Sequence, residues 1–299
     1  MTDRPRITAC IVCRNEADKL VPALESIRWV DEVLVLDLES SDGSAALARS
    51  HGARAIGRSP VPIVEAVRNE VADAAAGDWI LVLDPDERVS PGLAIRLDSL
   101  RDRDDIDAVV VPRMNIDFGY QPSSPLHRFE PQLRMYRRSR VRWPSFPNAL
   151  PDVAPDRLHR IESQDNLVLI HDRSRTVSEV VDRILRYAPE QGKAMVDDGQ
   201  VFTATQMLAG LARKAHREFV VGEPWRDGIP GMFRAGLLVA FHFYVWAAFW
   251  EASGARRTAA DDRVVRRLRL MFRLAGFAAR AAASAQRARH RLTRLRWPP

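Results

Sequence analysis

The sequence has few of the features that mark several common protein classes. Its 299 residues include only two cysteines, Cys10 and Cys13, and both fall in one apolar stretch of strand length. Successive side chains of a strand alternate between faces, so a disulfide framework is not expected and a reducing compartment fits better. We also expect no secretory signal, because residues 1–6 lead into only a short apolar run.

Two familiar phosphate-binding loops are absent as well. No Gly-x-Gly-x-x-Gly follows the first apolar stretch and no Gly-x-x-x-x-Gly-Lys occurs anywhere, which argues against a dinucleotide fold and a P-loop. A bound phosphate would then have to be neutralised by a metal ion and by side chains. The apolar run at residues 235–250, closed by Arg234 and Glu251, is shorter than the ~20 residues needed to span a bilayer.

Positive charge is concentrated at the C-terminal end of the chain. The whole chain has a net charge of +6, whereas residues 255–299 contain thirteen Arg and two Asp, which leaves residues 1–254 negative. From Asp262 onward, apolar and arginine residues alternate with helical spacing, which is typical of attachment to anionic lipid. The alternatives are a solvated helix packed on the domain and a disordered basic end. The apolar positions are Val265, Leu268, Leu270, Met271, Phe272, Leu274 and Phe277.

The first half of the chain alternates between apolar strands and amphipathic helices. This alternation predicts an α/β fold with a doubly wound, mostly parallel sheet. We expect strands at 7–13, 33–37, 53–56 and 79–83, and helices after Asn15, which can cap the first, at 45–49 and at 62–76. Residues 108–112 should extend the sheet. Residues 176–215 read as helical, with Pro189 interrupting or starting a helix.

Several of the predicted strands end in acidic residues. Five apolar residues at 79–83 run into Asp84-Pro85-Asp86-Glu87, and Glu16 and Asp37 follow two other strands. The carboxyl ends of parallel strands form the edge where open α/β sheets bind ligands. Two carboxylates one residue apart repel in a dry cleft, so a divalent cation and its phosphate ligand would compensate them. The alternative for Asp-Pro-Asp is a surface turn.

Four motifs in the right order and spacing carry a resemblance to a known family. They are Cys13-Arg14-Asn15-Glu16, residues 31–44 (DEVLVLDLESSDGS), Arg68-Asn69 and residues 77–88 (GDWILVLDPDER). Together they resemble the nucleotide-sugar half of family 2 inverting glycosyltransferases, which have the GT-A fold. The chain is similar in particular to the branch that includes the lipopolysaccharide-core β-glucosyltransferases. The match is close over residues 7–90 and looser to about 251.

The resemblance implies roles for individual residues. Asp37 would contact the base or ribose of a UDP- or GDP-linked sugar. Asp84 and Asp86 would form the Asp-x-Asp motif, with Asp86 the main ligand of a Mg²⁺ or Mn²⁺ ion that bridges the diphosphate. His171 resembles a family histidine that completes the metal or diphosphate site, although a satisfied histidine at a strand end explains it equally. The remaining donor-site positions would be Cys13, Arg14, Glu16, Asp42, Arg68, Asn69 and Arg134. By spacing alone, Arg68 also fits a solvated helix face.

Residues 113–150 differ in character and predict the acceptor side. Arginines alternate there with aromatic residues, which suits a phosphorylated or sugar-bearing acceptor, and nucleic acid is not expected because no nucleic-acid module is recognisable. Inverting transfer needs a base for the acceptor hydroxyl. Relatives in the lipopolysaccharide branch place a His-Glu pair here that this chain lacks. Asp152 is the nearest candidate, with Glu130 and Asp117 as rivals.

The sequence thus predicts a GT-A domain at residues 1–220 and a membrane-associating extension at 221–299. Residues 1–112 would be the nucleotide-sugar half and 113–220 the acceptor half. The aromatic-rich helix at 235–250 would lie in the membrane interface, or else be a buried core helix. The predicted activity is metal-dependent inverting transfer to a glycolipid or polyprenyl-linked acceptor, on the cytoplasmic membrane face. The alternative is a catalytically degenerate, membrane-associated nucleotide-sugar-binding or scaffold protein.

Overall fold

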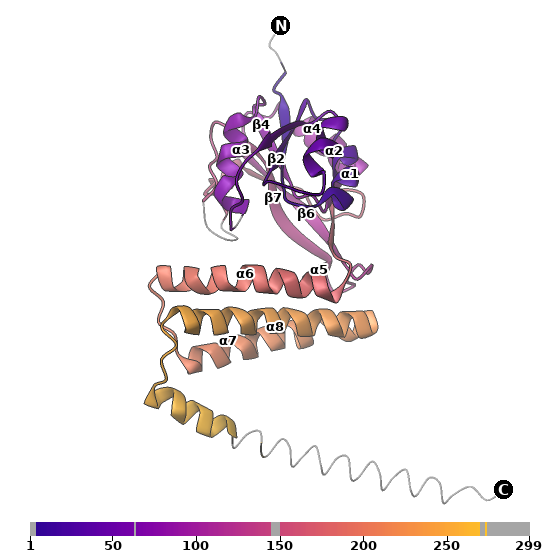
Figure 1. The fold of residues 1–299 in the computed structure, drawn as a ribbon. Helices are drawn as coiled ribbons and strands as arrows, with labels where there is room; N and C mark the ends of the chain where they lie inside the picture. Colours follow the sequence, from indigo (N-terminus) through magenta and orange to yellow (C-terminus); the bar gives the residue numbers. More distant parts are fainter. Residues whose placement is uncertain (1–3, 63, 145–149, 270–272, 274–299) are drawn as a thin grey trace, which may run out of the picture.

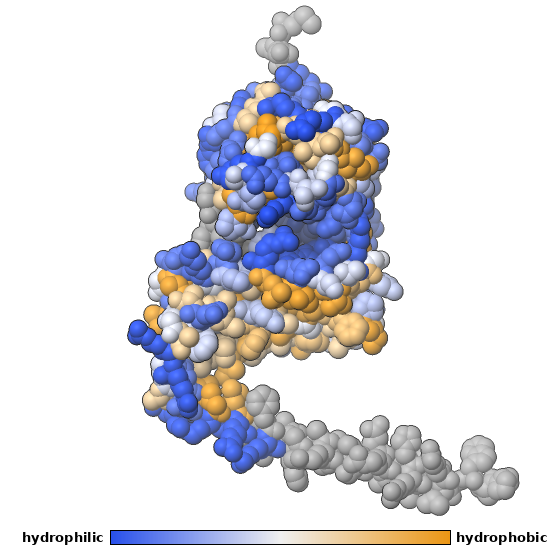
Figure 2. All heavy atoms as spheres, viewed as in Figure 1, coloured by the Kyte–Doolittle hydropathy of each residue, from blue (hydrophilic) through white to orange (hydrophobic). Residues whose placement is uncertain are grey.

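The computed structural model describes residues 4–62, 64–144, 150–269 and 273. An α/β part with a single sheet lies above a layer of long helices, and the chain runs from the first to the second (Figure 1). Hydrophobic residues gather on the surface of the helical layer, whereas the visible face of the α/β part is mostly hydrophilic (Figure 2). The two parts therefore present different surfaces to their surroundings.

Within the described residues, nine strands form one sheet in the order β3-β2-β1-β4-β7-β6-β9-β5, with β8 beside β6. The pairs among β3, β2, β1 and β4 are parallel, whereas β4–β7, β7–β6 and β9–β5 are antiparallel. The strands are β1 Ile7–Cys13, β2 Glu32–Asp37, β3 Arg54–Gly57, β4 Trp79–Leu83, β5 Glu87–Val89, β6 Ala108–Asp117, β7 Phe129–Arg137, β8 Leu158–Arg160 and β9 Leu169–Ser174.

Both faces of the sheet are covered, which explains why the strands read as continuous apolar runs. One face packs against α1 (Ala17–Ser26), α2 (Ser44–Ser50) and α4 (Pro91–Leu100). The other packs against α3 (Arg68–Ala74), with Tyr136 and Trp143 in the same apolar cluster. The shorter elements are α5 Pro125–Arg128, the 3₁₀ turns Val64–Val67, Pro155–Arg157 and Pro224–Asp227, and a π-helical turn at Arg217–Val221.

The α/β prediction is confirmed, but the sheet is mixed beyond β4. The first four strands follow the predicted alternation, and β6 extends to ten residues, longer than the predicted 108–112. Beyond β4 the order of strands in the sheet no longer follows the chain: β7 lies antiparallel between β4 and β6, whereas β8 and β9 both pair with β6 in parallel. The helix predicted at 62–76 is a 3₁₀ turn followed by α3, which ends at Ala74.

Two smaller predictions are wrong. Asn15 does not cap α1: the N-cap is Glu16, and Asn15 has φ +55° and accepts a hydrogen bond from Ser41 N at 2.8 Å. Pro189 neither starts nor ends a helix, because α6 (Val177–Asp197) runs through it. A mid-helix proline costs about 3 kcal/mol, and here α6 offsets that cost by burying Ile184 and Ala188 along α8.

The helical layer consists of α6, α7 (Ala204–His216) and α8 (Gly228–Ala252), which pack side by side (Figure 1). Gly192 of α6 allows the closest approach, because a Cβ there would lie 2.6 Å from Phe249 N of α8. The chain then continues into a helical segment at residues 259–269. Most of the predicted basic tail helix, including Leu270, Met271, Phe272, Leu274 and Phe277, lies outside the described residues.

Candidate active site

The predicted acidic strand ends do meet at one edge of the sheet. In the parallel register Cys13 of β1 pairs with Asp37 of β2, and Ile11 of β1 pairs with Leu83 of β4. This brings together Glu16, Asp37, Asp84 and Asp86, which we call the acidic edge. Burial and the nearby charge of Asp86 raise the pKa of Glu16 to about 7. The acidic edge therefore carries more negative charge than its own surroundings compensate.

At the β1–β2 end of the acidic edge, two hydrogen bonds hold Asp37 in place. Asp37 is buried and accepts hydrogen bonds from Ser40 N at 3.1 Å and from Cys13 Sγ at 3.7 Å. Burial, followed by the charge of Asp37, raises the pKa of the Cys13 thiol to about 12, so this thiol stays protonated. Arg14 is exposed at the same end.

Close to Asp37 in the sequence, Asp42 accepts hydrogen bonds from the first residues of two helices. One carboxylate oxygen accepts from Ala17 N of α1 at 2.9 Å, and the other accepts from Ser44 N of α2 at 3.0 Å. The hydrogen bond from the Ser44 hydroxyl and that from Ala17 N lower the pKa of Asp42. In this structure Asp42 holds the loop around the predicted nucleotide position.

Asp84 belongs to a network of opposite charges. Arg134 is buried and donates to Asp84 Oδ2 at 2.7 Å and also to Glu87, while Arg113 contacts Glu87 at 3.2 Å and Glu130 at 2.5 Å. Burial alone would raise the pKa of Asp84, but Arg134 and Arg68 hold it well below its usual range. The arginines thus supply for Asp84 the compensating positive charge that the sequence pattern predicts for a divalent cation.

Arg68 and Asn69 both lead to Trp143. The Arg68 guanidinium lies 4.4 Å from the centroid of the Trp143 ring and 4.0 Å from Asp84 Oδ1. Asn69 exchanges two hydrogen bonds with the Trp143 backbone, at 2.8 and 3.0 Å. Arg68 is 8% exposed, so the reading of it as a solvated helix face is wrong. Asn69 fixes the segment that stacks on Arg68.

His171 and Asp86 face each other with two acceptor atoms. Asn115 Nδ2 donates to Glu130 at 3.2 Å, which turns Asn115 Oδ1 toward His171 Nδ1 at 2.7 Å. An amide oxygen can only accept, so Nδ1 carries a proton, and whenever Nε2 carries none it presents a lone pair to Asp86 Oδ2, 3.4 Å away. Two facing acceptors are stabilised by a cation between them.

This pair fits the divalent ion that the family resemblance implies. Imidazole nitrogen and carboxylate oxygen are both accepted by Mn²⁺, and Mg²⁺ and Mn²⁺ commonly combine one or two protein ligands with substrate phosphates. Asn115 orients His171 in the way that outer-sphere partners orient metal ligands. Among the residues that the structure describes, no group of three or more His, Cys, Asp or Glu side chains is arranged to hold a metal ion.

The three base candidates have different surroundings. Glu130 is bound by Arg113 and Asn115, which outweigh the effect of burial and lower its pKa to about 2. Asp117 is buried and paired with both Nε and Nη2 of Arg173, at 2.8 and 2.5 Å. Asp152 is exposed. Its neighbour Val153 packs against the apolar cluster that contains Trp143.

Three polar residues of the site were not predicted, namely Glu87, Arg113 and Asn115. Glu87 is fully buried between Arg134 and Arg113, and its Oε2 accepts from Asp84 N at 3.0 Å. The sequence signal for Glu87 was its place directly after Asp86. Arg113 and Asn115 alternate along β6 and were not distinguishable, because their partners come from strands far away in sequence.

The chain matches the model of a known protein family. Residues 8–162, more than half of the chain, match the model described as glycosyl transferase family 2. An uncharacterized glycosyltransferase of Rickettsia typhi is 23% identical over 216 residues, which cover 68% of this chain and 74% of that protein. The lipopolysaccharide core biosynthesis glycosyltransferase LpsC of Rhizobium meliloti is 22% identical and covers 86% of this chain and 96% of its own.

A TPR repeat-containing protein of Synechococcus elongatus is 35% identical over 136 residues, which cover 44% of this chain and only 34% of that protein. Among solved structures, mannosyltransferase PcManGT from Pyrobaculum calidifontis, in complex with GDP-Man and Mn²⁺, is 17% identical with a TM-score of 0.43. It covers 90% of this chain and 81% of its own. With more than half of its length matched by the family model, the chain belongs to glycosyl transferase family 2 and is a glycosyltransferase with an α/β fold.

Proposed function

We propose that this protein transfers a sugar from UDP or GDP to a hydroxyl of a lipid-linked acceptor, with inversion and with the help of Mg²⁺ or Mn²⁺. One observation carries the proposal: His171 Nε2 and Asp86 Oδ2 face each other at 3.4 Å, at the carboxyl edge of the sheet. Asp86 and His171 would hold the cation, and the donor diphosphate would supply further ligands. When bound, the cation stabilises charge on the departing nucleoside diphosphate.

The remaining residues of the edge have proposed roles in donor binding. Asp37, the last residue of β2, would accept hydrogen bonds from the base or ribose. Cys13, Arg14 and Glu16 would line the same pocket, whose loop is held by Asp42. Arg68 faces the site from α3 and would approach the diphosphate, with Asn69 fixing the Trp143 segment beneath it. Asp84 and Arg134 would form the rigid floor.

We propose Asp152 as the base that takes the proton of the acceptor hydroxyl. The low pKa of Glu130 makes it a weak base, and Asp117 is held by two hydrogen bonds from Arg173. Asp152 is exposed, and its neighbour Val153 packs against the apolar cluster that also contains Trp143. Asp152 is therefore the candidate that an acceptor can reach from solvent.

We further propose that residues 1–220 catalyse the reaction and residues 221–299 hold the enzyme on the cytoplasmic membrane face. The helical segment 224–252 is long and apolar enough to cross a membrane by length and composition. It nevertheless packs along α6 and α7 and contains the buried Arg234, so a position in the membrane interface fits better. Apolar side chains exposed on the helical layer also favour contact with a membrane interface. They are Val181 and Leu185 of α6 and Ile229, Phe233, Phe243, Tyr244 and Trp250 of α8.

The proposal is tested by assaying transfer from UDP- and GDP-sugars to lipid extracts, with Mn²⁺ or with a chelator. We expect transfer to need the metal and Asp152→Asn to reduce kcat by about 10²–10⁴-fold, as loss of a general base does. Asp156→Asn, also exposed and four residues away, serves as the matched control and should retain activity. Metal-dependent nucleotide binding without transfer to any acceptor would instead support the catalytically degenerate binding protein.

A further inference from the structure

The guanidinium of Arg68 is held by an aromatic stack rather than by hydrogen bonds. Its Cζ atom lies 4.4 Å from the centroid of the Trp143 ring, and Nη2 lies 4.0 Å from Asp84 Oδ1, beyond hydrogen-bond distance. Within the part of the chain that the structure describes, its nitrogens make no hydrogen bond, and none of them is sealed from the surface. Stacking uses the face of the guanidinium plane, whereas the N–H groups point outward within that plane. The donors of Arg68 are therefore free to bind a ligand.

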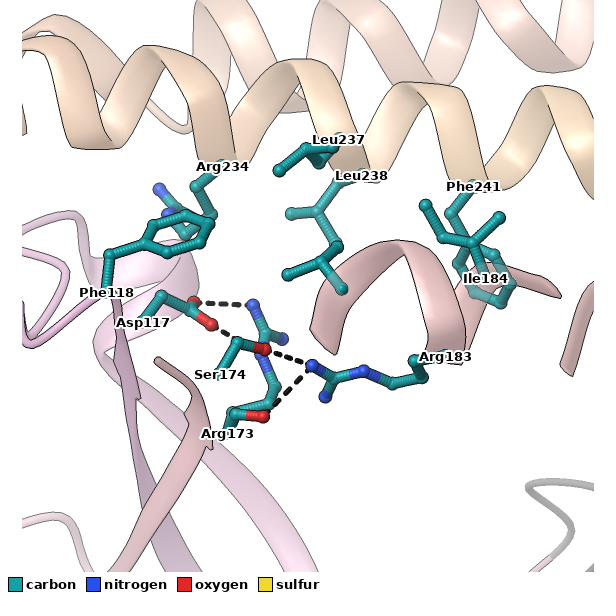
Figure 3. A pocket seen from close by; sticks show the side chains of 11 residues that line it. Asp117, Phe118, Arg173, Ser174, Arg183, Ile184, Arg234, Leu237, Leu238 and Phe241 are labelled. Carbon is teal, nitrogen blue, oxygen red and sulfur yellow. Dashed lines mark hydrogen bonds and ion pairs between the residues drawn. The ribbon is translucent and has the colours of Figure 1, made fainter. Parts of the chain in front are cut away.

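Two other arginines packed on the sheet use their donors on carboxylates. Arg134 donates to Asp84 and Glu87 at the acidic edge. Arg173, at the junction with the helical layer, donates to Asp117 through both Nε and Nη2 (Figure 3). A guanidinium that is bound to carboxylate oxygens has fewer N–H groups left for a ligand. Both side chains are therefore parts of the scaffold.

A second stack of arginine on tryptophan, at the opposite end of β4, provides a direct comparison. The Arg137 guanidinium lies 4.5 Å from the centroid of the Trp79 ring. Arg137 also donates to the carbonyl oxygen of Arg103 at 2.8 Å and to Asp104 at 3.0 Å. Trp79 is the first residue of β4, so this stack lies away from the acidic edge. What distinguishes Arg68 is thus its unused N–H groups next to that edge.

The Trp143 ring is itself held in one orientation. The Trp143 backbone exchanges two hydrogen bonds with Asn69, the residue after Arg68. The ring meets that of Tyr136 in an edge contact, with centroids 6.2 Å apart. Trp143 is buried in the apolar cluster on the α3 side of the sheet. An arginine side chain that packs on a fixed ring is confined before a ligand arrives, so it loses less rotamer freedom on binding.

We propose that Trp143 is a positioning residue, whose ring holds the Arg68 guanidinium toward the diphosphate of the nucleotide-sugar donor. The inference rests on the proposed glycosyl transfer, in which Arg68 approaches that diphosphate. Arg68 is the group that contacts phosphate, and Trp143 acts through it. The segment after β7, which the sequence pattern predicts to lie on the acceptor side, thereby also sets how tightly the donor binds. Trp143 contributes to donor affinity only while Arg68 is present.

Isothermal titration of the full-length protein with UDP and GDP, in the presence of Mn²⁺, tests the inference in a double-mutant cycle. We expect Trp143→Leu and Arg68→Gln each to weaken binding of the preferred nucleotide by about tenfold, the size of one desolvated cation–π contact or charge-assisted hydrogen bond. Combining the two changes should weaken binding no further than Arg68→Gln alone, to within about twofold.

Two further variants serve as controls for the cycle. Trp143→Phe keeps an aromatic face for the guanidinium and should restore most of the affinity that Trp143→Leu loses. Arg137→Gln removes the other stack, on Trp79, and should leave nucleotide affinity within about twofold of the wild type, as expected of a distant site. Circular dichroism checks that each variant is folded. If Trp143→Leu does not fold, Trp143→Met replaces it in the cycle, because methionine fills more of the space without an aromatic face.

Equal nucleotide affinity of the wild type and Trp143→Leu would overturn the inference. So would a further loss of about tenfold when Trp143→Leu is added to Arg68→Gln, because Trp143 would then act without Arg68. A wild type that binds neither nucleotide refutes the proposed function and the inference with it. Binding that is equally tight in the wild type and in every Trp143 variant refutes the inference alone.

Discussion

The Asp84 network and the Asp86–His171 pair lie at the same edge of the sheet, yet their charges are compensated in different ways. Asp84, Glu87 and Glu130 each contact an arginine: Arg134 contacts Asp84, and Arg113 contacts Glu87 and Glu130. Asp86 instead faces His171 Nε2 at 3.4 Å. The difference separates charges that stabilise the scaffold from the pair that we propose to hold a cation.

Breaking the balanced network should give the largest effect on stability. Glu87→Gln removes the negative charge that both Arg134 and Arg113 contact, while keeping a similar shape. Loss of one partner from a buried ion pair costs about 3–5 kcal/mol, and we expect a loss of unfolding free energy in this range. Urea denaturation followed by circular dichroism measures it.

The control for this comparison is Glu25→Gln, which removes an ion pair to Arg28 between two largely exposed side chains. That change should alter stability by less than about 1 kcal/mol. If Glu87→Gln were no more destabilising than Glu25→Gln, the network around Asp84 would not be a scaffold.

The junction between the two parts gives a prediction about pH. Glu218 is buried in the π-helical turn after α7 and is paired with His127 at 2.7 Å and Lys214 at 2.9 Å. Burial would raise the pKa of Glu218, but these two partners lower it to about 2, below its ordinary value of 4.5. A lowered folded-state pKa contributes stability that is present above about pH 4.5 and is lost as the pH falls toward 2.

From the size of this shift we expect Glu218→Gln to reduce stability at pH 7 by about 3 kcal/mol, and by progressively less below pH 4.5. Urea unfolding at pH values from 7 to 3 measures the slope. A variant whose stability follows the same pH dependence as the wild type would show that Glu218 does not link the helical layer to the sheet through its charge.

Alanine substitutions at two glycines of the helical layer should change stability less, and in opposite directions. Gly192→Ala adds a Cβ that would lie 2.6 Å from Phe249 N, so α6 and α8 must separate, at a cost of about 1–3 kcal/mol. Gly236 of α8 has no atom within 4 Å of an added Cβ, so Gly236→Ala should stabilise by about 0.5–1 kcal/mol. Thermal unfolding of both variants measures the contrast, and equal shifts would contradict the close packing of α6 on α8.

Local patterns in the sequence predicted the first four strands and the position of Asp84 and Asp86, because parallel strands buried on both faces are continuous apolar runs. They did not predict β5, a three-residue strand whose pairing with β9 places Glu87 opposite His171. That pairing joins residues 84 positions apart. The partners of Asp84, Glu87 and His171 likewise come from other strands, so no local pattern distinguishes them from solvated charges.

The helical layer was harder to predict for a related reason. Pro189 is exposed and lies inside α6 because the burial of Ile184 and Ala188 outweighs its local preference, and Arg234 is buried where α8 meets the sheet. The domain limits at residue 220 remain a prediction. Family membership depended instead on the order and spacing of four motifs, and the match over residues 8–162 bears it out.

Electron paramagnetic resonance of Mn²⁺, titrated with UDP or GDP and the full-length protein, tests most directly whether Asp86 and His171 hold the cation. We predict that the wild type binds the Mn²⁺–nucleotide complex, that Asp86→Ala weakens this binding by at least about tenfold, and that ¹⁵N-labelled histidine adds a hyperfine coupling that His171→Ala removes. Equal affinity of the wild type and Asp86→Ala for Mn²⁺ and nucleotide would contradict the account.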